Sequence, residues 1–229
     1  MLESKDRWSH RQEGGVEEKQ EAWATQREEM VRLQLQRRGI VDLEVLRAMA
    51  KVPRHLFVPK EERALAYQDQ PLEIGWGQTI SQPYMVALMS ESLQVETGAK
   101  VLEIGAGSGY QSAVLLELGC RLYTVERIAA LVELARSNLK AAGYNDFGLF
   151  HQDGYEGYLR AAPFGGILVA AAAPALPVEL VMLLKPGARM VIPVGVWDQE
   201  LLEIRRTEQG YRIKRLGAVR FVPLLHGLA

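Results

Sequence analysis

The stretch from Lys100 to Tyr110, KVLEIGAGSGY, constrains the fold of this chain more than any other. An apolar run opens it, three alternating glycines follow, and a helix-forming segment continues to residue 118. A strand, a tight glycine turn and a helix in this order begin an α/β nucleotide-binding unit. We therefore expect an α/β fold with a doubly wound, mostly parallel sheet of about seven strands. Helices should precede the sheet, and a hairpin should follow it.

The spacing of the glycines indicates which ligand this turn suits. A dinucleotide fingerprint, G-x-G-x-x-G, requires its third glycine at position 110, where Tyr110 stands. Glu103 lies two residues before the first glycine, where a carboxylate would repel a pyrophosphate but suit an ammonium or sulfonium group. The pattern E-x-G-x-G-x-G resembles the cofactor loop of S-adenosylmethionine-dependent methyltransferases, which implies cofactor binding by Glu103, Gly105, Gly107 and Gly109. The alternative is a purely structural glycine turn.

Charge and cysteine content exclude several classes of protein. A formal net charge of −1 over 229 residues argues against a nucleic-acid partner bound through bulk charge. The single cysteine, Cys120, excludes an internal disulfide framework and a multi-thiolate metal site. The first ten residues contain no apolar signal segment, and no apolar run approaches the ~20 residues of a membrane span. We expect a cytoplasmic protein with no membrane partner.

The beginning of the chain differs in composition from the rest. Its first 38 residues hold eight basic and eight acidic residues, a balance that does not bury an ordered core before about residue 20. We expect a charged, flexible arm over residues 1–22 and one domain over residues 23–229. That domain divides into a helical cap (23–66), a Rossmann-like core (84–195) and C-terminal strands (196–229).

A second informative stretch, YQDQPLEIGWGQTISQP, covers residues 67–83. The two glycines that flank Trp76 predict a turn, after which Thr79 and Ser81 lie on one side of an extended segment. Pro83 suits the first position of a helix that continues to about Leu93. A serine two residues before such a proline is also typical of simple capping or turn chemistry. The pattern alone leaves both roles of Ser81 open.

This second stretch makes the resemblance specific. It is similar, from Tyr67-x-Asp69 to the run GQTISQP at 77–83, to the segment ahead of the cofactor loop in protein-L-isoaspartate O-methyltransferases. VERI at 125–128, IPVG at 192–195 and RFVPL at 220–224 resemble that family at matching spacings, so that the likeness runs from about residue 27 to 227. It implies a repair enzyme that transfers a methyl group from S-adenosylmethionine to the free α-carboxylate of isoaspartyl residues. Isoaspartyl peptides and proteins are then the partners, and we expect a monomer.

The reaction implied by the resemblance needs no acid or base catalysis from a side chain. A carboxylate is already ionised near pH 7, because carboxyl pKa values are about 4, and it needs no general base. The four histidines are scattered and suit structural roles better. We expect Ser81, with Thr79, to hydrogen-bond the substrate carboxylate and hold it in line with the methyl group. The family then implies closure of the ester to a succinimide that opens to normal aspartate.

Two acidic residues at predicted strand ends complete the expected site. Glu126 ends the predicted second strand, 126 − 105 = 21 residues after the first loop glycine, where a carboxylate accepts ribose hydroxyls. A surface charge paired with Arg127 is the alternative for Glu126. Asp153-Gly154 follows the predicted third strand, and methyltransferases of this class resemble one another in placing an acidic residue there beside the adenine. Without the resemblance, Asp-Gly indicates only a turn.

The predicted fourth strand departs from the family. At Gly165-Gly166 the family usually has Asp and often a bulkier residue, and at Ala170 it usually has Thr. The two glycines should weaken the edge of the strand. Two other functions therefore stay open. One is a small-molecule methyltransferase on the same fold, and the other is a non-catalytic binding module.

Overall fold

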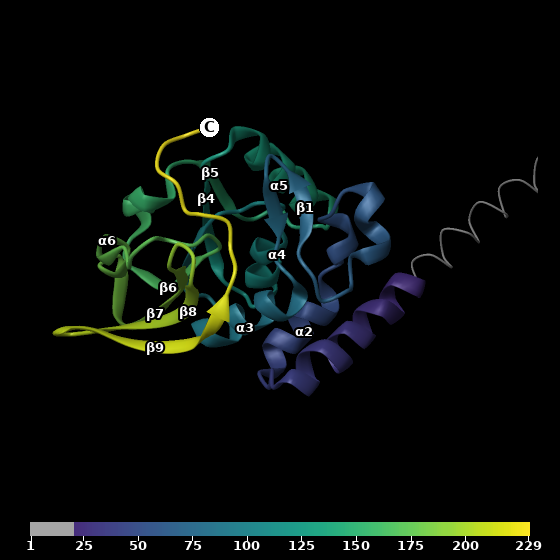
Figure 1. Ribbon diagram of the computed structural model, residues 1–229, viewed down its shortest axis with the longest axis horizontal. Helices are drawn as coiled ribbons and strands as arrows, with labels where there is room; N and C mark the ends of the chain where they lie inside the picture. Colours follow the sequence, from purple (N-terminus) through teal and green to yellow (C-terminus); the bar gives the residue numbers. More distant parts are fainter. Residues whose placement is uncertain (1–20) are drawn as a thin grey trace, which may run out of the picture.

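The computed structural model describes residues 21–229, and its central feature is one sheet of seven strands in the order β5-β4-β3-β6-β7-β8-β9 (Figure 1). The pairs from β5 to β7 are parallel, and β8 and β9 form an antiparallel hairpin at one edge. The expected α/β sheet and its C-terminal hairpin are confirmed. The strands are β3 (Lys100–Ile104), β4 (Arg121–Glu126), β5 (Gly148–His151), β6 (Phe164–Val169), β7 (Leu184–Val194), β8 (Gln199–Thr207) and β9 (Gly210–Val219).

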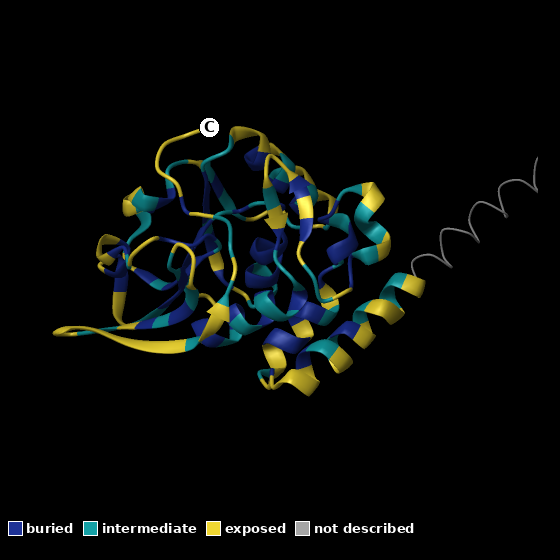
Figure 2. Cartoon of the chain, in the orientation of Figure 1, coloured by how far each residue is buried: buried dark blue, intermediate teal, exposed yellow. Residues whose placement is uncertain are grey.

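Both faces of the parallel strands are covered, which explains why the strands are nearly continuous apolar runs. Val101 and Leu168 point to one face, where they pack with Met89 of a helix. Leu102 and Ile167 point to the other face and belong to a second cluster. Figure 2 shows the buried residues concentrated in the central strands and an exposed β9. The helices of this region are α3 (Pro83–Leu93), α4 (Tyr110–Glu117), α5 (Ala129–Ala141) and α6 (Val178–Val181), with the short 3-10 turns η5 (Gly154–Glu156) and η6 (Leu159–Ala161).

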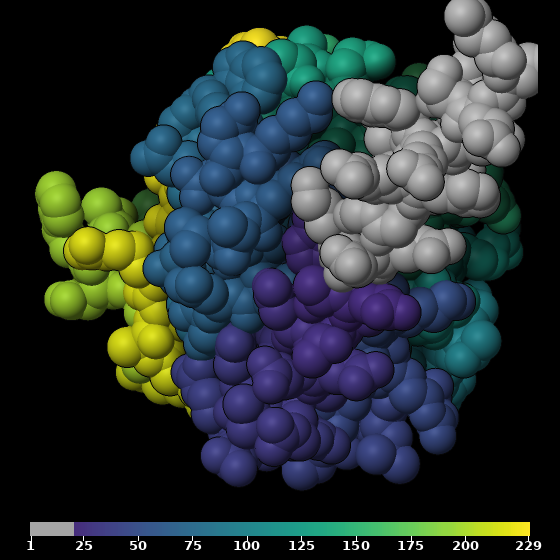
Figure 3. Space-filling model, turned by 90° about the vertical axis from the view of Figure 1, so that its right-hand side faces the viewer, coloured from purple at the N-terminus to yellow at the C-terminus, as the bar shows by residue number. Residues whose placement is uncertain are grey.

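The N-terminal helices form a cap beside the sheet. Residues 21–29 are helical and continue into η1 (Met30–Leu35) and η2 (Gln36–Arg38), which end at Gly39 in the left-handed conformation, as predicted. Figure 3 shows this purple segment lying over the blue residues that follow it. Residues 1–20 of the predicted arm lie outside the described residues, and its last two residues are helical. The remaining cap elements are α2 (Leu43–Lys51), η3 (Arg54–Leu56) and η4 (Lys60–Leu65).

The sequence predicts a helix with Asp42 as its N-cap and with Leu43, Leu46 and Met49 or Ala50 buried. The N-cap is confirmed, because Asp42 Oδ1 accepts hydrogen bonds from the amides of Glu44 and Val45. The predicted burial of Leu43 is wrong, since Leu43 is exposed and Val45 faces the core instead.

A hairpin of β1 (Leu72–Gly75) and β2 (Gln78–Ile80) stands apart from the main sheet. Its turn has positive φ at both central positions, 52° at Trp76 and 67° at Gly77, which is the pattern of a type I′ hairpin turn. The turn predicted at Trp76 is therefore confirmed. The hairpin delivers Ser81 to the start of α3, which begins at Pro83 as predicted.

Towards the C-terminus the sequence predicts a helix over residues 177–184 and a final strand over residues 219–224, and both predictions are wrong. The helix expected over 177–184 shortens to α6, because β7 already begins at Leu184 despite Pro186. The strand expected over 219–224 is an extended segment with a single bridge, at Pro223, whose ring nitrogen has no hydrogen to donate to a ladder. None of the helices within residues 21–229 is long and apolar enough to cross a membrane.

The glycine pair in β6 does not lie at an edge. β6 runs between β3 and β7, so the expectation of a weakened edge does not apply. A Cβ on Gly166 would lie 2.7 Å from Cγ1 of Val95, because the segment after α3 fills the space that a side chain would take. The missing side chains are replaced by packing from a neighbouring segment.

Candidate functional site

One cleft lies at the carboxyl ends of β3, β4 and β6, where the strand order reverses and α/β sheets bind ligands. We call it the main cleft. The β1–β2 hairpin closes one side of it, and the extended C-terminal segment crosses another. It is lined chiefly by residues 78–81, the glycine loop 104–108, residues 125–128, Gly154, Ala170, Ala171 and residues 222–225.

The glycine loop has the backbone that its sequence requires. Gly105 and Gly109 have φ values of 94° and 89°, which L side chains rarely adopt, and Gly109 is the N-cap of α4. A Cβ on Gly105 would lie 3.6 Å from the Cβ of Ala170 on the facing wall. Glycine therefore keeps the space between these two walls open, at the amino end of a helix whose first N–H groups lack helical partners.

Glu126 ties the glycine loop to the end of β4. Its side chain is 6% exposed and lines the main cleft. Oε2 accepts a hydrogen bond from the amide of Gly107 (3.1 Å), and Oε1 accepts one from Ile128 (2.9 Å). Each carboxylate oxygen has a second lone pair left for a ligand hydroxyl. The alternative of a pair with Arg127 fails within residues 21–229, because Arg127 donates to the carbonyl of Gly227 instead.

Glu103 lies beneath the loop and not in the cleft. It is fully buried, and its Oε2 accepts hydrogen bonds from the hydroxyls of Ser112 and Thr124. Burial raises the pKa of Glu103 to about 8, so that the carboxyl is mostly neutral at pH 7. The expected carboxylate at the mouth of the cleft is therefore Glu126. Glu103 instead holds together the strands and the helix on which the loop is mounted.

Asp153 and Gly154 are neighbours in the sequence, but only Gly154 lines the main cleft. Gly154 lines the main cleft, and a Cβ there would lie only 2.5 Å from Cγ2 of Ile104. Asp153 is not among the lining residues and accepts hydrogen bonds from the amides of Tyr155 and Gly227. Burial alone would raise the pKa of Asp153, but these amides hold it below its ordinary value. The adenine contact expected for Asp153 stays a prediction.

Thr79 and Ser81 lie where the main cleft meets a second depression, which we call the side groove. Four residues line both spaces, namely Thr79, Ser81, Ala170 and Val222, and only the first two have polar side chains. The side groove also contains Arg38, Pro71, Gln82, Tyr84, Met85 and residues 218–221. A group held by Thr79 and Ser81 can therefore face both spaces.

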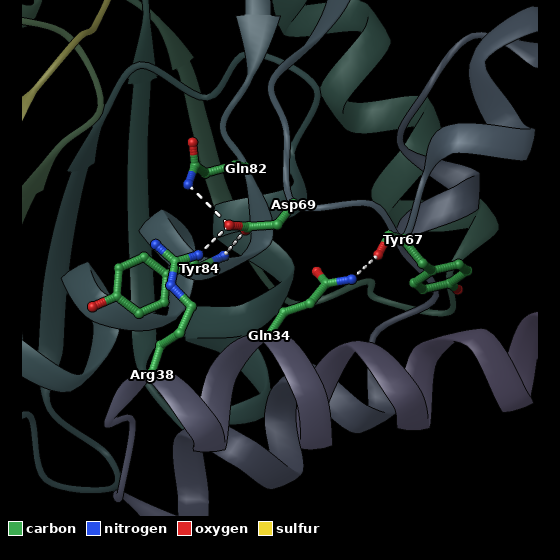
Figure 4. A network of polar contacts seen from close by, with 6 residues as sticks. All are labelled: Gln34, Arg38, Tyr67, Asp69, Gln82 and Tyr84. Carbon is green, nitrogen blue, oxygen red and sulfur yellow. Dashed lines mark hydrogen bonds and ion pairs between the residues drawn. The ribbon is translucent and has the colours of Figure 1, made fainter.

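Ser81 is not the cap of α3. Within residues 21–229 its hydroxyl has no hydrogen-bond partner, whereas Oδ1 of Asp69 accepts the amide hydrogen of Tyr84 at 2.9 Å (Figure 4). The capping interpretation of Ser81 is therefore wrong for this helix. Asp69 was missed as a site residue. Its only signal in the sequence was its place in the motif Tyr67-x-Asp69.

The described histidines take no part in the main cleft. His55 is buried and stacks on Trp23 with 4.0 Å between ring centroids, and desolvation by burial lowers its pKa to about 4. His151 faces the carbonyl of Arg127, and His226 stacks on Tyr155. Among residues 21–229 no cluster of three or more metal-binding side chains occurs. The main cleft thus offers hydroxyls, side-chain and backbone amides, the carboxylate of Glu126 and the guanidinium of Arg127, which suit binding and orientation.

Comparisons with known proteins point to one family. Residues 25–229 match the family model of protein-L-isoaspartate(D-aspartate) O-methyltransferase (PCMT). A protein-L-isoaspartate O-methyltransferase of Methanospirillum hungatei is 52% identical over 90% of this chain and 95% of its own length. A protein-L-isoaspartate O-methyltransferase from a Synechococcus species is 45% identical over 96% of this chain and 97% of its own length. A Plasmodium falciparum member, solved with S-adenosyl-L-homocysteine, aligns with a TM-score of 0.76 at 28% identity over 87% of this chain and 98% of its own.

Proposed function

This chain belongs to the protein-L-isoaspartate O-methyltransferase family, and we propose that Thr79 and Ser81 hold the α-carboxylate of an isoaspartyl residue between its two cavities. The enzyme is a protein-L-isoaspartate (D-aspartate) O-methyltransferase that uses S-adenosylmethionine. The observation that carries the proposal is that these two hydroxyl residues are the polar side chains common to the main cleft and the side groove.

The residues of the main cleft fit the cofactor. S-adenosylmethionine supplies the methyl group as a sulfonium. We assign Glu126 to the ribose hydroxyls, since its carboxylate lines the cleft and keeps free lone pairs. The backbone of Gly105 and Gly107 forms the wall against which a ligand packs closely, and Gly154 adds a second surface without a side chain.

Positioning is the main catalytic task of this site. The substrate carboxylate is ionised near pH 7, so it needs no proton removed before it attacks the methyl group. Hydroxyl groups of Ser81 and Thr79 donate hydrogen bonds that fix its direction, and the walls of the main cleft exclude water from the line of attack. The resulting methyl ester makes a better leaving group, which favours closure to the succinimide and its opening to aspartate.

We also propose that residues 23–229 act as one domain and that the protein is a monomer, because one chain supplies the hydroxyls of Thr79 and Ser81 and the carboxylate of Glu126, so the site needs no residue from a second copy. A cytoplasmic location stays a prediction from the sequence. Light scattering after size-exclusion chromatography tests the monomer, and a dimer mass would contradict it.

The experiment that tests the activity compares two synthetic peptides that differ only in one residue, isoaspartyl or normal aspartyl. Labelled methyl groups from S-adenosylmethionine should enter the isoaspartyl peptide alone. Labelling of metabolites but of neither peptide would favour a small-molecule methyltransferase on this fold. Cofactor binding without turnover of either peptide would favour a binding module.

A further inference from the structure

The side groove carries positive charge next to the reacting position. Its lining includes two arginines, Arg38 and Arg220, and contains no carboxylate residue. Within the described chain Arg220 has neither a hydrogen bond nor an ion pair through its guanidinium, and it is exposed. A peptide whose isoaspartyl residue reaches Ser81 can run along this groove, because Ser81 lines both the groove and the main cleft.

Contacts within the protein hold the side chain of Arg38 in place (Figure 4). Its guanidinium lies 3.6 Å from the ring centroid of Tyr84, and its Nη1 donates to Oδ2 of Asp69. The same carboxylate accepts a hydrogen bond from the side-chain amide of Gln82 at 3.2 Å. A side chain held by two contacts, one with Tyr84 and one with Asp69, loses little rotamer entropy when it binds a ligand, and a planar guanidinium suits a carboxylate.

The guanidinium of Arg38 keeps N–H donors that are available to a ligand. Its side chain remains 45% exposed, while that of Asp69 is 18% exposed. An arginine carries five N–H donors, and the bond to Asp69 occupies one of them. Asp69 neutralises about one of the two arginine charges, so the groove keeps an excess of about one positive charge through Arg220.

From this arrangement we propose that the side groove binds the peptide that flanks the isoaspartyl residue and selects a carboxylate there, with Arg38 as its anchor. Asp69 and Tyr84 are positioning residues for that anchor. The proposal rests on the proposed function, because it takes the isoaspartyl residue to be at Ser81. It adds a preference for acidic neighbours, which a site that recognises only the isoaspartyl group would not have.

The test uses two isoaspartyl peptides that differ in the residues beside the isoaspartate, Glu in one and its neutral isostere Gln in the other. Both are acetylated and amidated, so that no terminal carboxylate competes. For the unmodified protein at low ionic strength, KM should be about fivefold lower for the Glu peptide, the scale of about 1 kcal/mol at an exposed ion pair. Arg38→Met should bring the KM ratio close to 1, and Arg38→Lys should keep part of it.

Arg37→Met is the matched control, because Arg37 is an exposed neighbour in η2 that does not line the groove and changes the net charge equally. It should keep the fivefold ratio. Arg220→Met should lower the ratio in part, and it keeps the test valid if Arg38→Met unfolds.

The outcomes separate the two proposals. If the unmodified protein methylates neither peptide, the proposed function fails. If it methylates both with equal KM, the function stands and the carboxylate preference is overturned. The preference is also overturned if Arg38→Met raises both KM values equally and leaves their ratio unchanged, because Arg38 would then serve only the packing of η2.

Discussion

The two walls of the main cleft are held in different ways. The glycine-loop wall is fixed from within, by the backbone between β3 and α4 and by the carboxyls of Glu103 and Glu126. A second wall, which carries Thr79 and Ser81, is formed by β2 of the separate hairpin and the residue that follows it, and Asp69 holds the start of the next helix through the amide of Tyr84. Cofactor geometry thus depends on the sheet and its first loop. Substrate geometry depends on a hairpin outside the sheet and on the contact of Asp69 with Arg38 of the N-terminal cap.

The largest effect that we expect is on cofactor affinity, when the carboxylate of Glu126 is removed from the glycine-loop wall. We predict that Glu126→Ala weakens S-adenosylmethionine binding by about 1.5–3 kcal/mol, because hydrogen bonds to a charged group are lost. Isothermal titration calorimetry measures the affinity. Glu133→Ala, an exposed change on α5 outside the cleft, is the control and should leave the affinity unchanged. Equal affinities for all three proteins would leave Glu126 only the structural role of holding the amides of Gly107 and Ile128.

The pH dependence of stability tests the buried support of the same wall. The pKa of Glu103 is about 8 in the fold, against an ordinary value of 4.5, so the folded protein binds one more proton between these values. The stabilisation is complete below about pH 4.5 and is lost as pH rises through 8, at up to about 1.4 kcal/mol per pH unit. Glu103→Gln should remove this slope. Urea unfolding at pH 6, 7 and 8 measures it, and parallel slopes in both proteins would contradict the assignment.

Removing the carboxylate of Asp69, which supports the wall of Thr79 and Ser81, should lower the free energy of unfolding slightly and should also lower turnover of the isoaspartyl peptide. Asp69→Ala should lower the free energy of unfolding by about 1 kcal/mol, as loss of a helix cap does, and should reduce kcat/KM for the isoaspartyl peptide. Asp42→Ala removes the cap of α2, away from both cavities, and is the matched control. It should cost similar stability with normal turnover. Identical turnover in the two variants would show that Asp69 is only a cap.

The smallest effect is expected outside both walls. Deleting residues 1–20, whose charges are balanced and whose sequence has no apolar periodicity, should leave Tm and activity nearly unchanged, since little apolar area is lost. Thermal melting and a methylation assay check this. A fall of several degrees in Tm, or a clear loss of turnover, would mean that this segment contributes to the domain.

Features set by neighbouring residues can be predicted from the sequence, whereas contacts between separate elements cannot. The strand, the glycine turn and the end of β4 at Glu126 follow from neighbouring residues, and the structure confirms them. The burial of Glu103 was missed, because its hydroxyl partners Ser112 and Thr124 come from other elements. Asp69 and Arg38, which are 31 positions apart, meet only when η2 lies beside the segment that precedes β1. Periodicity and spacing carry no signal for such a contact.

Ser81 provides the most direct test of the central claim, that the hydroxyls between the two cavities position the substrate. Single-turnover methylation of an isoaspartyl peptide by Ser81→Ala should fall by about 10²-fold, the penalty of misplacing a reacting group. Its affinity for S-adenosylmethionine and its Tm should stay unchanged, since the hydroxyl has no partner within residues 21–229. Ser81→Thr should recover part of the rate if its added methyl group fits. Normal turnover by Ser81→Ala, with or without a lower Tm, would contradict the account.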